Sequence, residues 1–451
     1  MSIQLPIAGA VGAAAVEARR AGAPAWLAER RSAAWEAFTE LPMPSPQRDE
    51  DWRRTDVSEL RLEEYIADPG TAAAGEALLQ AMSQLRLRAA PEAAFVASTR
   101  RGLRRREGTD MLDAQGVIIC SLDDAAVQHP EQLRRALSTV PPEESKFLAL
   151  WNALWRGGCF VYVPPGVEAR VPVWAAHTAA GAGAAIFPAT VAVLDDRASL
   201  TLIDVYASPA GDDDMVSVAA TPLVLGEGAR LDYCLLQQWG MGTWHVATHR
   251  ASAGRDARLR FFGATLGARL QKAYWEVLLD GQGAEATLTG ICFGDGAQHL
   301  DHQSLQDHRA PQTRSDLLLK VAVRDEARSI YGGLIEVQRR AQQSDGYVQN
   351  RNLMLSRGAR ASGIPRLEIK ADDVRCSHGV TAGHIDNDQR FYLESRGVPR
   401  AEADRLIVRG FMQDALDRCP HQGVRELLTE LLDEEIAGHP VAGVSSDEDV
   451  A

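Results

Sequence analysis

A cysteine and a histidine two residues apart, Cys376 and His378, form the pair in this sequence best suited to bind iron or sulfur species. Side chains at positions i and i+2 of an extended strand point to the same face, so the thiol and the imidazole would lie side by side. Thiolate and imidazole groups are both ligands of iron. The alternative is a buried structural pair, and the residue types alone favour that alternative.

Three histidines, His299, His302 and His308, form a second candidate metal site with Asp301 and Asp307. Imidazoles and carboxylates together can bind zinc or iron. Strand alternation would place His299 and His302 on opposite faces, so the spacing favours polar packing over a metal site. The six cysteines of the chain are widely and irregularly spaced, which indicates reduced thiols rather than disulfides or a structural zinc site.

Motifs of nucleotide-dependent and hydrolytic enzymes are missing from the sequence. None of the four lysines follows a glycine, so there is no GxxxxGK[ST] phosphate loop. Neither HExxH nor GxSxG occurs. The paired carboxylates Asp195–Asp196 and Asp372–Asp373 fall at expected turns, where aspartate bonds the local backbone. We therefore do not expect an enzyme.

The charge of the chain argues against nucleic acid as a partner. It contains 48 Lys and Arg residues against 61 Asp and Glu residues, a formal net charge of −13, whereas binding to a phosphate backbone needs clustered cations. No cation precedes the apolar stretch from Ile7 to Val16, and the stretch from Ala175 to Leu194 is rich in Ala and Gly and contains His177 and Pro188. We expect a cytoplasmic chain without a membrane span.

The elements that must position these residues fall into three regions. Residues 1–145 show helical spacing of apolar residues, as do residues 385–438, where the stripe includes Leu427 and Leu431. We expect helical domains over both ranges and a disordered acidic tail over residues 439–451. The middle range, 146–384, consists of short alternating apolar runs divided by Gly and Asp turns, a pattern typical of strands.

The middle region contains an internal repeat of a turn, an alanine and a strand. A period near 30 residues indicates the stacked coils of a β-solenoid, because a single coil cannot bury its inward residues alone. A β-sandwich with similar turn spacing is the alternative. The gaps between the repeats are 31, 28, 27, 43 and 32 residues, at Ala198, Ala229, Ala257, Ala284, Ala327 and Ala359. We interpret the 43-residue gap as an insertion that contains the three histidines.

The stretch from Pro365 to Gly379, PRLEIKADDVRCSHG, resembles the signature of the SufB/SufD family of SUF iron–sulfur cluster assembly. Similar segments are RDEDWRRT at 48–55, GGCFVYVPPG at 157–166 and FYLESRGV at 391–398, and His302 and His308 agree as well. The resemblance covers nearly the whole chain. It implies a right-handed parallel β-helix between N-terminal and C-terminal helical domains, in a scaffold subunit rather than an enzyme.

The resemblance also implies partners and site residues. The Cys-Ser-His-Gly tetrad is similar to the SufD branch, and Ile369 stands where the SufB branch has a cysteine. The implied complex contains SufB, SufD and the ATPase SufC; it assembles an iron–sulfur cluster transiently, and this chain alone binds no cofactor. The implied SufB interface contains His378 with Cys376 beside it. The implied SufC contact involves Tyr392, Arg396, Gly397, Leu427 and Leu431.

Three other interpretations remain open from the sequence. A polysaccharide-degrading β-helix enzyme would use clustered surface carboxylates and is normally secreted. Within the family, the chain could be a SufB-like subunit or a purely structural one.

Overall fold

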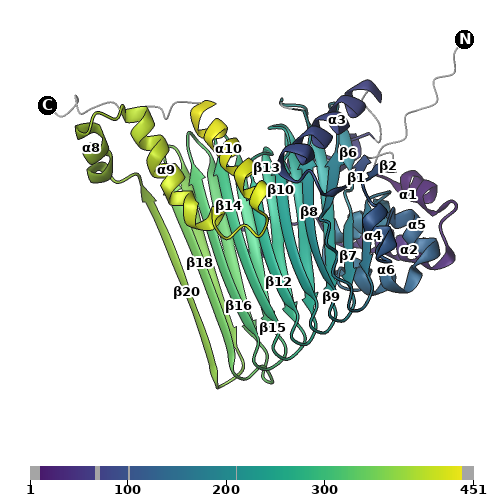
Figure 1. Cartoon of the computed structure of the whole chain (residues 1–451). Helices are drawn as coiled ribbons and strands as arrows, with labels where there is room; N and C mark the ends of the chain where they lie inside the picture. Colours follow the sequence, from purple (N-terminus) through teal and green to yellow (C-terminus); the bar gives the residue numbers. More distant parts are fainter. Residues whose placement is uncertain (1–10, 67–71, 100–101, 210, 439–451) are drawn as a thin grey trace, which may run out of the picture.

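The computed structural model describes residues 11–66, 72–99, 102–209 and 211–438. The chain forms a β-solenoid of about eight turns with parallel sheets, and helices lie toward both ends of the sequence (Figure 1). This confirms the predicted fold class and excludes the β-sandwich. The acidic tail predicted for 439–451 lies outside the described residues.

Two long sheets, here called A and B, form the walls of the solenoid, and every strand pairing is parallel except β1–β2 and β3–β4. In spatial order sheet A contains β3 (Ile118–Cys120), β4 (Cys159–Val163), β7 (Thr190–Leu194), β9 (Met215–Leu225), β11 (Thr243–Ala253), β13 (Leu270–Leu279), β15 (His299–His308), β17 (Arg328–Val337) and β19 (Arg360–Ile369), with β6 (Ala184–Ile186) paired to β9. Sheet B contains β2 (Gly102–Glu107), β1 (Ala94–Thr99), β5 (Val173–Thr178), β8 (Ser199–Ala207), β10 (Arg230–Gln238), β12 (Arg258–Thr265), β14 (Glu285–Gly294), β16 (Arg314–Val323), β18 (Ser344–Met354) and β20 (Val374–His384).

Alternation along each strand divides the side chains between two environments. On β10, Leu231, Tyr233 and Leu235 belong to the interior cluster between the sheets, whereas Cys234 and Leu236 pack outward against helices. Both faces of the strand are thus buried, which explains the nearly continuous apolar sequence of many strands.

Helices cover part of the outer face of each sheet. Residues of α1 (Ala13–Arg20), α2 (Ala25–Glu40), α5 (Leu122–Gln128), α6 (Pro130–Leu137) and α7 (Lys146–Leu154) pack in one hydrophobic cluster with the outer face of sheet A. Residues of α3 (Ala72–Ala89), α9 (Arg400–Leu416) and α10 (Gln422–Gly438) pack in another with sheet B. The remaining elements are α4 (Asp110–Ala114), α8 (Asn387–Ser395) and the 3-10 turns Glu50–Trp52, Leu62–Glu64 and Pro142–Glu144.

The corners of the coils explain the repeat and correct one expectation. Glu285 pairs in register with Arg314, so the residues before them, Ala284 and Thr313, occupy equivalent corners of successive coils. The 43-residue gap therefore contains no insertion. Ala327 and Ala359 instead precede β17 and β19 of sheet A, so the alanine series changes from the corner before sheet B to the corner before sheet A.

The terminal regions differ in part from the helical expectation. Residues 1–145 contain the short strands β1, β2 and β3 as well as helices, because the solenoid begins within this range. Helical structure resumes at α8. The domain boundaries at 145 and 384 stay predictions. No helix in the described part of the chain is long and apolar enough to cross a membrane.

Candidate functional site

The solenoid ends in two strands that no further described strand covers. Sheet A ends at β19 and sheet B at β20, which lies at the outer edge of the structure (Figure 1). An edge strand presents unpaired backbone N–H and C=O groups, and proteins usually cover such edges or protect them. We call the end formed by β19 and β20 the open end.

Cys376 and His378 lie on β20 and point toward the interior side of the solenoid. They are in register with Gly346 and Val348 of β18. A side chain at Gly346 would meet His308 and Ile335 inside the solenoid, and Val348 is part of the interior cluster. The expected common face is therefore present. Cys376 is half-buried against the interior cluster, whereas His378 is exposed.

The Cys376 thiol and the His378 imidazole differ in how readily they could bind a metal ion. Burial raises the pKa of the Cys376 thiol above its ordinary value, and a backbone hydrogen bond with Gly346 opposes this more weakly. A metal would therefore have to displace a proton from this thiol. No hydrogen bond or ion pair engages the His378 imidazole within the described residues, so its ring nitrogens are accessible at the open end.

The open end offers few further metal ligands. Ile369, at the end of β19, is partly exposed and has no group that could bind iron. Among residues 11–66, 72–99, 102–209 and 211–438, no three His, Cys, Asp or Glu side chains lie close enough together to hold a metal ion. The described residues of the open end therefore do not by themselves form a three-ligand metal site.

The three histidines of the second candidate site do not converge. The Nε2 atom of His302 lies 3.0 Å from Thr265 Oγ1, inside the solenoid. His299 faces outward, with Nε2 2.9 Å from Thr55 Oγ1. Burial lowers the pKa of His302 and of His308 to about 4, so both interior imidazoles are neutral. The arrangement agrees with polar packing.

A buried ion pair on the outer face of sheet A was not found from the sequence. Lys272 Nζ lies 2.8 Å from Asp301 Oδ2, and both side chains are fully buried. Residues 51–55, before the 3-10 turn Leu62–Glu64, cover them: Thr55 donates to Asp301, and Lys272 donates to the carbonyl of Asp51. The only indication of this contact in the sequence was that the segment RDEDWRRT and the region of His302 both resembled the same family. We call this group the N-terminal latch.

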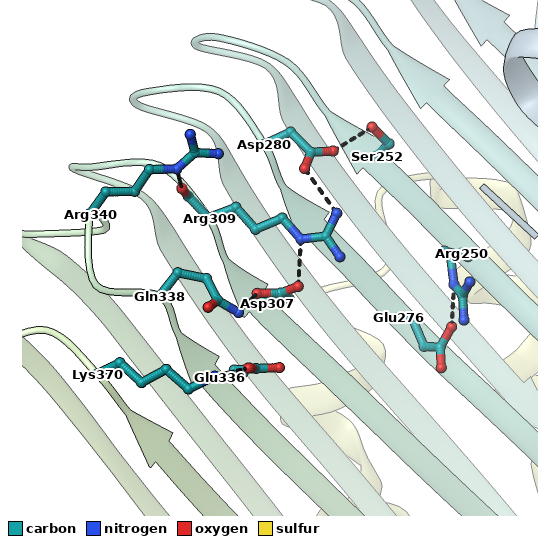
Figure 2. Close-up of polar contacts among 10 residues, drawn as sticks. All are labelled: Arg250, Ser252, Glu276, Asp280, Asp307, Arg309, Glu336, Gln338, Arg340 and Lys370. Atoms are coloured by element: carbon teal, nitrogen blue, oxygen red, sulfur yellow. Dashed lines mark hydrogen bonds and ion pairs between the residues drawn. The ribbon is translucent and has the colours of Figure 1, made fainter. Parts of the chain in front are cut away.

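Several carboxylates on the outer face of sheet A and at its corners are paired with cations. Figure 2 shows these ion pairs, which extend across the sheet from β11 toward the end of β19. We call them the ion-pair ladder. The pairs are Arg250–Glu276 at 2.5 Å, Arg309–Asp307 at 2.5 Å, Arg309–Asp280 at 3.2 Å and Lys370–Glu336 at 2.7 Å. Carboxylates neutralised in this way are poor candidates for calcium binding or glycoside cleavage, so the ladder gives no support to the polysaccharide-degrading alternative.

The predicted SufC-contact residues fall into two groups, one packed within the chain on α10 and one at α8. Leu427 is 3% exposed and packs with Leu431 against the helices and strands of sheet B, so this part of the stripe belongs to the chain's own core. Tyr392 on α8 is 57% exposed, and its neighbour Phe391 is 70% exposed. The Arg396 guanidinium lies 5.2 Å from the Tyr392 ring centroid. Gly397 has φ +86°, which allows the chain to leave α8.

Comparison with known proteins identifies the family. A family model described as "SUF system FeS cluster assembly, SufBD core domain" matches residues 177–411, which is more than half of the chain. The chain belongs to the SufBD family. It is similar to the iron–sulfur cluster assembly protein SufD of Bacillus subtilis, with 26% identity over 92% of this chain and 94% of the relative. It is also 26% identical to SufB of the same organism, over 70% of this chain and 68% of the relative.

The SufBD match includes the open end and α8 but stops before α10. Cys376, His378 and Tyr392 therefore lie inside the matched region, and Leu427 and Leu431 lie outside it. A SufBD family protein of Staphylococcus epidermidis is likewise 26% identical over 70% of this chain. These comparisons show that the chain belongs to the SUF system of iron–sulfur cluster assembly.

Proposed function

We propose that this SufBD protein is the SufD-type subunit of a cytoplasmic SUF complex. It would act as a scaffold without catalytic activity of its own, paired with SufB and bound to the ATPase SufC. The observation that supports this most directly is the open end, where two edge strands lie beside an accessible imidazole and a half-buried thiol.

A second β-solenoid of the same family is the partner that best fits the open end. Its own terminal strands could pair with β19 and β20 and continue both sheets, so the unpaired backbone groups would be satisfied. His378 would then lie at the junction between the two subunits. Additional ligands for the cluster, which is the cargo of the complex, would come from the SufB side.

Two features favour the SufD assignment over SufB. Identity to the two Bacillus subtilis relatives is equal, but the similarity to SufD extends over nearly the full length of both chains. At position 369 this chain has isoleucine, which can neither bind iron nor hold a persulfide sulfur. The thiol chemistry at the junction would therefore fall to the partner.

The exposed aromatic residues of α8 support a contact with SufC. Phe391 and Tyr392 form an apolar surface beside Arg396, and contiguous exposed apolar side chains often mark an interaction site. The chain has no phosphate loop, so ATP hydrolysis in the complex would belong to SufC.

Co-expression with SufB and SufC tests this function. The expected result is a complex that contains all three chains and assembles a cluster when iron and sulfide are supplied without oxygen. The purified chain alone should show no magnesium-dependent ATP turnover. Failure to co-purify with SufB, or cluster assembly by SufB and SufC at full yield without this chain, would contradict the proposal.

A further inference from the structure

A recess lies near the first coils of the solenoid, away from the open end. It is formed where α1 and the end of α7 approach the ends of β1 and β5 and the chain after β6. Its cavity volume is about 30 Å³, and the recess is partly open to solvent. We call it the N-terminal recess; the lining residues that matter here are Arg19, Ser98, Arg156, His177, Thr178 and Phe187.

The charge of the N-terminal recess is positive and poorly compensated. Arg19 and Arg156 both line it, and no carboxylate does so within the described residues. Arg19 uses its Nε to donate to the carbonyl of Leu154 at 3.2 Å, and its other nitrogens have no described partner. The pKa of Arg19 is lowered, first by burial and then by repulsion from Arg156. Two guanidinium groups that repel each other favour an anion between them.

A nearby carboxylate does not neutralise this pair. Asp123 is the acid whose charge acts on Arg19, but it does not line the recess. Its Oδ2 atom accepts a hydrogen bond from the Gly157 amide at 2.7 Å. The compensation that Asp123 provides is also shared with Arg31.

A buried hydroxyl in the recess has no partner. Thr178 is 3% exposed, and its Oγ1 atom makes no hydrogen bond within the described structure. Buried hydroxyls are normally paired, so an orphan that lines a recess indicates a missing acceptor or donor. Ser98 also lines the recess, and its Oγ accepts from the Gly158 amide at 3.0 Å, which leaves its own hydrogen available to a ligand.

The imidazole at the back of the recess is held in place by the solenoid interior. His177 Nε2 lies 2.7 Å from Thr190 Oγ1 and 3.2 Å from Asp204 Oδ1, both buried. These contacts fix the ring through one nitrogen. Two guanidinium groups and the hydroxyl donors together are groups that bind a small oxyanion, and the fixed imidazole forms a wall behind them.

We propose that the N-terminal recess binds a small phosphate-type oxyanion, held by Arg19 and Arg156 and by the hydroxyl groups of Thr178 and Ser98. Free phosphate and a phosphate ester share this chemistry. Phe187 and Pro188 provide an apolar wall against which the organic part of an ester would pack. This site is distinct from the open end and does not depend on the proposed partners.

Calorimetric titration of the full chain with inorganic phosphate tests the site, with sodium chloride of equal ionic strength as reference. Saturable binding to the wild type is expected. Arg156→Gln should weaken it by about tenfold or more, because a charged hydrogen-bond donor is lost. Arg230→Gln removes the same charge from an exposed position of β10 and should leave binding unchanged.

Thr178→Val separates binding from folding. It removes an unpaired hydroxyl, so the unfolding midpoint without phosphate should stay the same or rise, while phosphate affinity falls. Tighter binding of phenyl phosphate than of phosphate would assign the site to an ester, and the reverse would assign it to the free ion. The proposal is overturned if phosphate acts no differently from chloride, or if Arg156→Gln and Arg230→Gln bind phosphate equally well.

Discussion

His378 and Val348 are register partners on β20 and β18, yet Val348 is 1% exposed and His378 is exposed. Both side chains belong to the interior-facing row of sheet B. Val348 is covered because β20 follows it, whereas no described strand follows β20. A partner strand at the open end would bury His378 in the way that β20 buries Val348.

We predict that His378→Gln leaves assembly with SufB and SufC intact but reduces cluster yield severalfold. Glutamine keeps much of the size and polarity of histidine but is a poor iron ligand. Cluster formation is measured by anaerobic reconstitution of the purified complex and its visible absorption. Cys376→Ala should reduce the yield less, because the pKa of this thiol is raised and the thiol is half-buried.

His384→Gln is the matched control for this experiment. His384 is exposed on the same strand, and its Nδ1 lies 3.1 Å from the carbonyl of Met354. Its substitution should leave the yield unchanged. Wild-type rate and yield for His378→Gln would show that this histidine is only structural.

Two substitutions in the C-terminal helices should separate partner binding from stability. Tyr392→Ala removes an exposed ring, so it should weaken the retention of SufC without changing the free energy of unfolding by more than about 0.5 kcal/mol. Leu427→Ala leaves a cavity in the cluster on sheet B and should destabilise the chain by about 2–5 kcal/mol. Pull-down with SufC and chemical denaturation measure the two effects.

The assignment of SufC binding to Tyr392 and of stability to Leu427 would be refuted by the opposite pattern. If Leu427→Ala abolished SufC binding at unchanged stability, the stripe on α10 would be the contact surface. Gln413→Ala, at a polar position on α9, serves as a control that should alter neither measurement.

We predict that Lys272→Met destabilises the chain by about 3–5 kcal/mol, because it leaves the Asp301 carboxylate buried without its cation. Thr55 and Asp51 contact the same pair, so residues 50–57 should also become more sensitive to proteolysis. Denaturation and limited digestion measure these effects.

Lys370→Met is the control for the Lys272→Met substitution in the N-terminal latch. It breaks an ion pair with Glu336 at 2.7 Å in which the lysine is exposed, and such pairs add little to stability because solvent screens them. Equal losses of stability in the two variants would contradict the proposed importance of burial.

Because the interior histidines are neutral in the folded chain, we predict that the free energy of unfolding decreases in weak acid. Burial lowers the pKa of His302 from 6.5 to about 4, so between these values the unfolded chain binds a proton that the folded chain excludes. The contribution of the neutral His302 ring to the free energy of unfolding is fully present above pH 6.5 and is lost as the pH falls toward 4. For one such imidazole the loss between pH 7 and pH 5 is about 2 kcal/mol.

Denaturation of His302→Gln at pH 7 and pH 5 measures this contribution. The variant should lose less stability than the wild type between the two values, by about 2 kcal/mol. An unchanged pH dependence in His302→Gln would show that this ring is not excluded from protonation in the folded state.

The sequence by itself predicted the solenoid and determined where the candidate pair lies in the chain. The spacing near 30 residues reflects the length of one coil, and the alternation of Leu231, Tyr233 and Leu235 with outward-facing residues reflects the strand period of two. Both are local properties of the chain. The common face of Cys376 and His378 could be predicted for the same reason.

Only the tertiary structure decided which surfaces meet. The corner at Thr313 has no alanine, so the repeat could not be followed there without the register of β14 and β16. Helical periodicity predicted an apolar stripe at Leu427 but not whether the chain's own sheet or a partner would cover it. Lys272 and Asp301 are 29 residues apart and meet Thr55 from far earlier in the chain, because neighbouring coils and the N-terminal segment come together only on folding. Such contacts depend on distances in space that no local pattern of residues encodes.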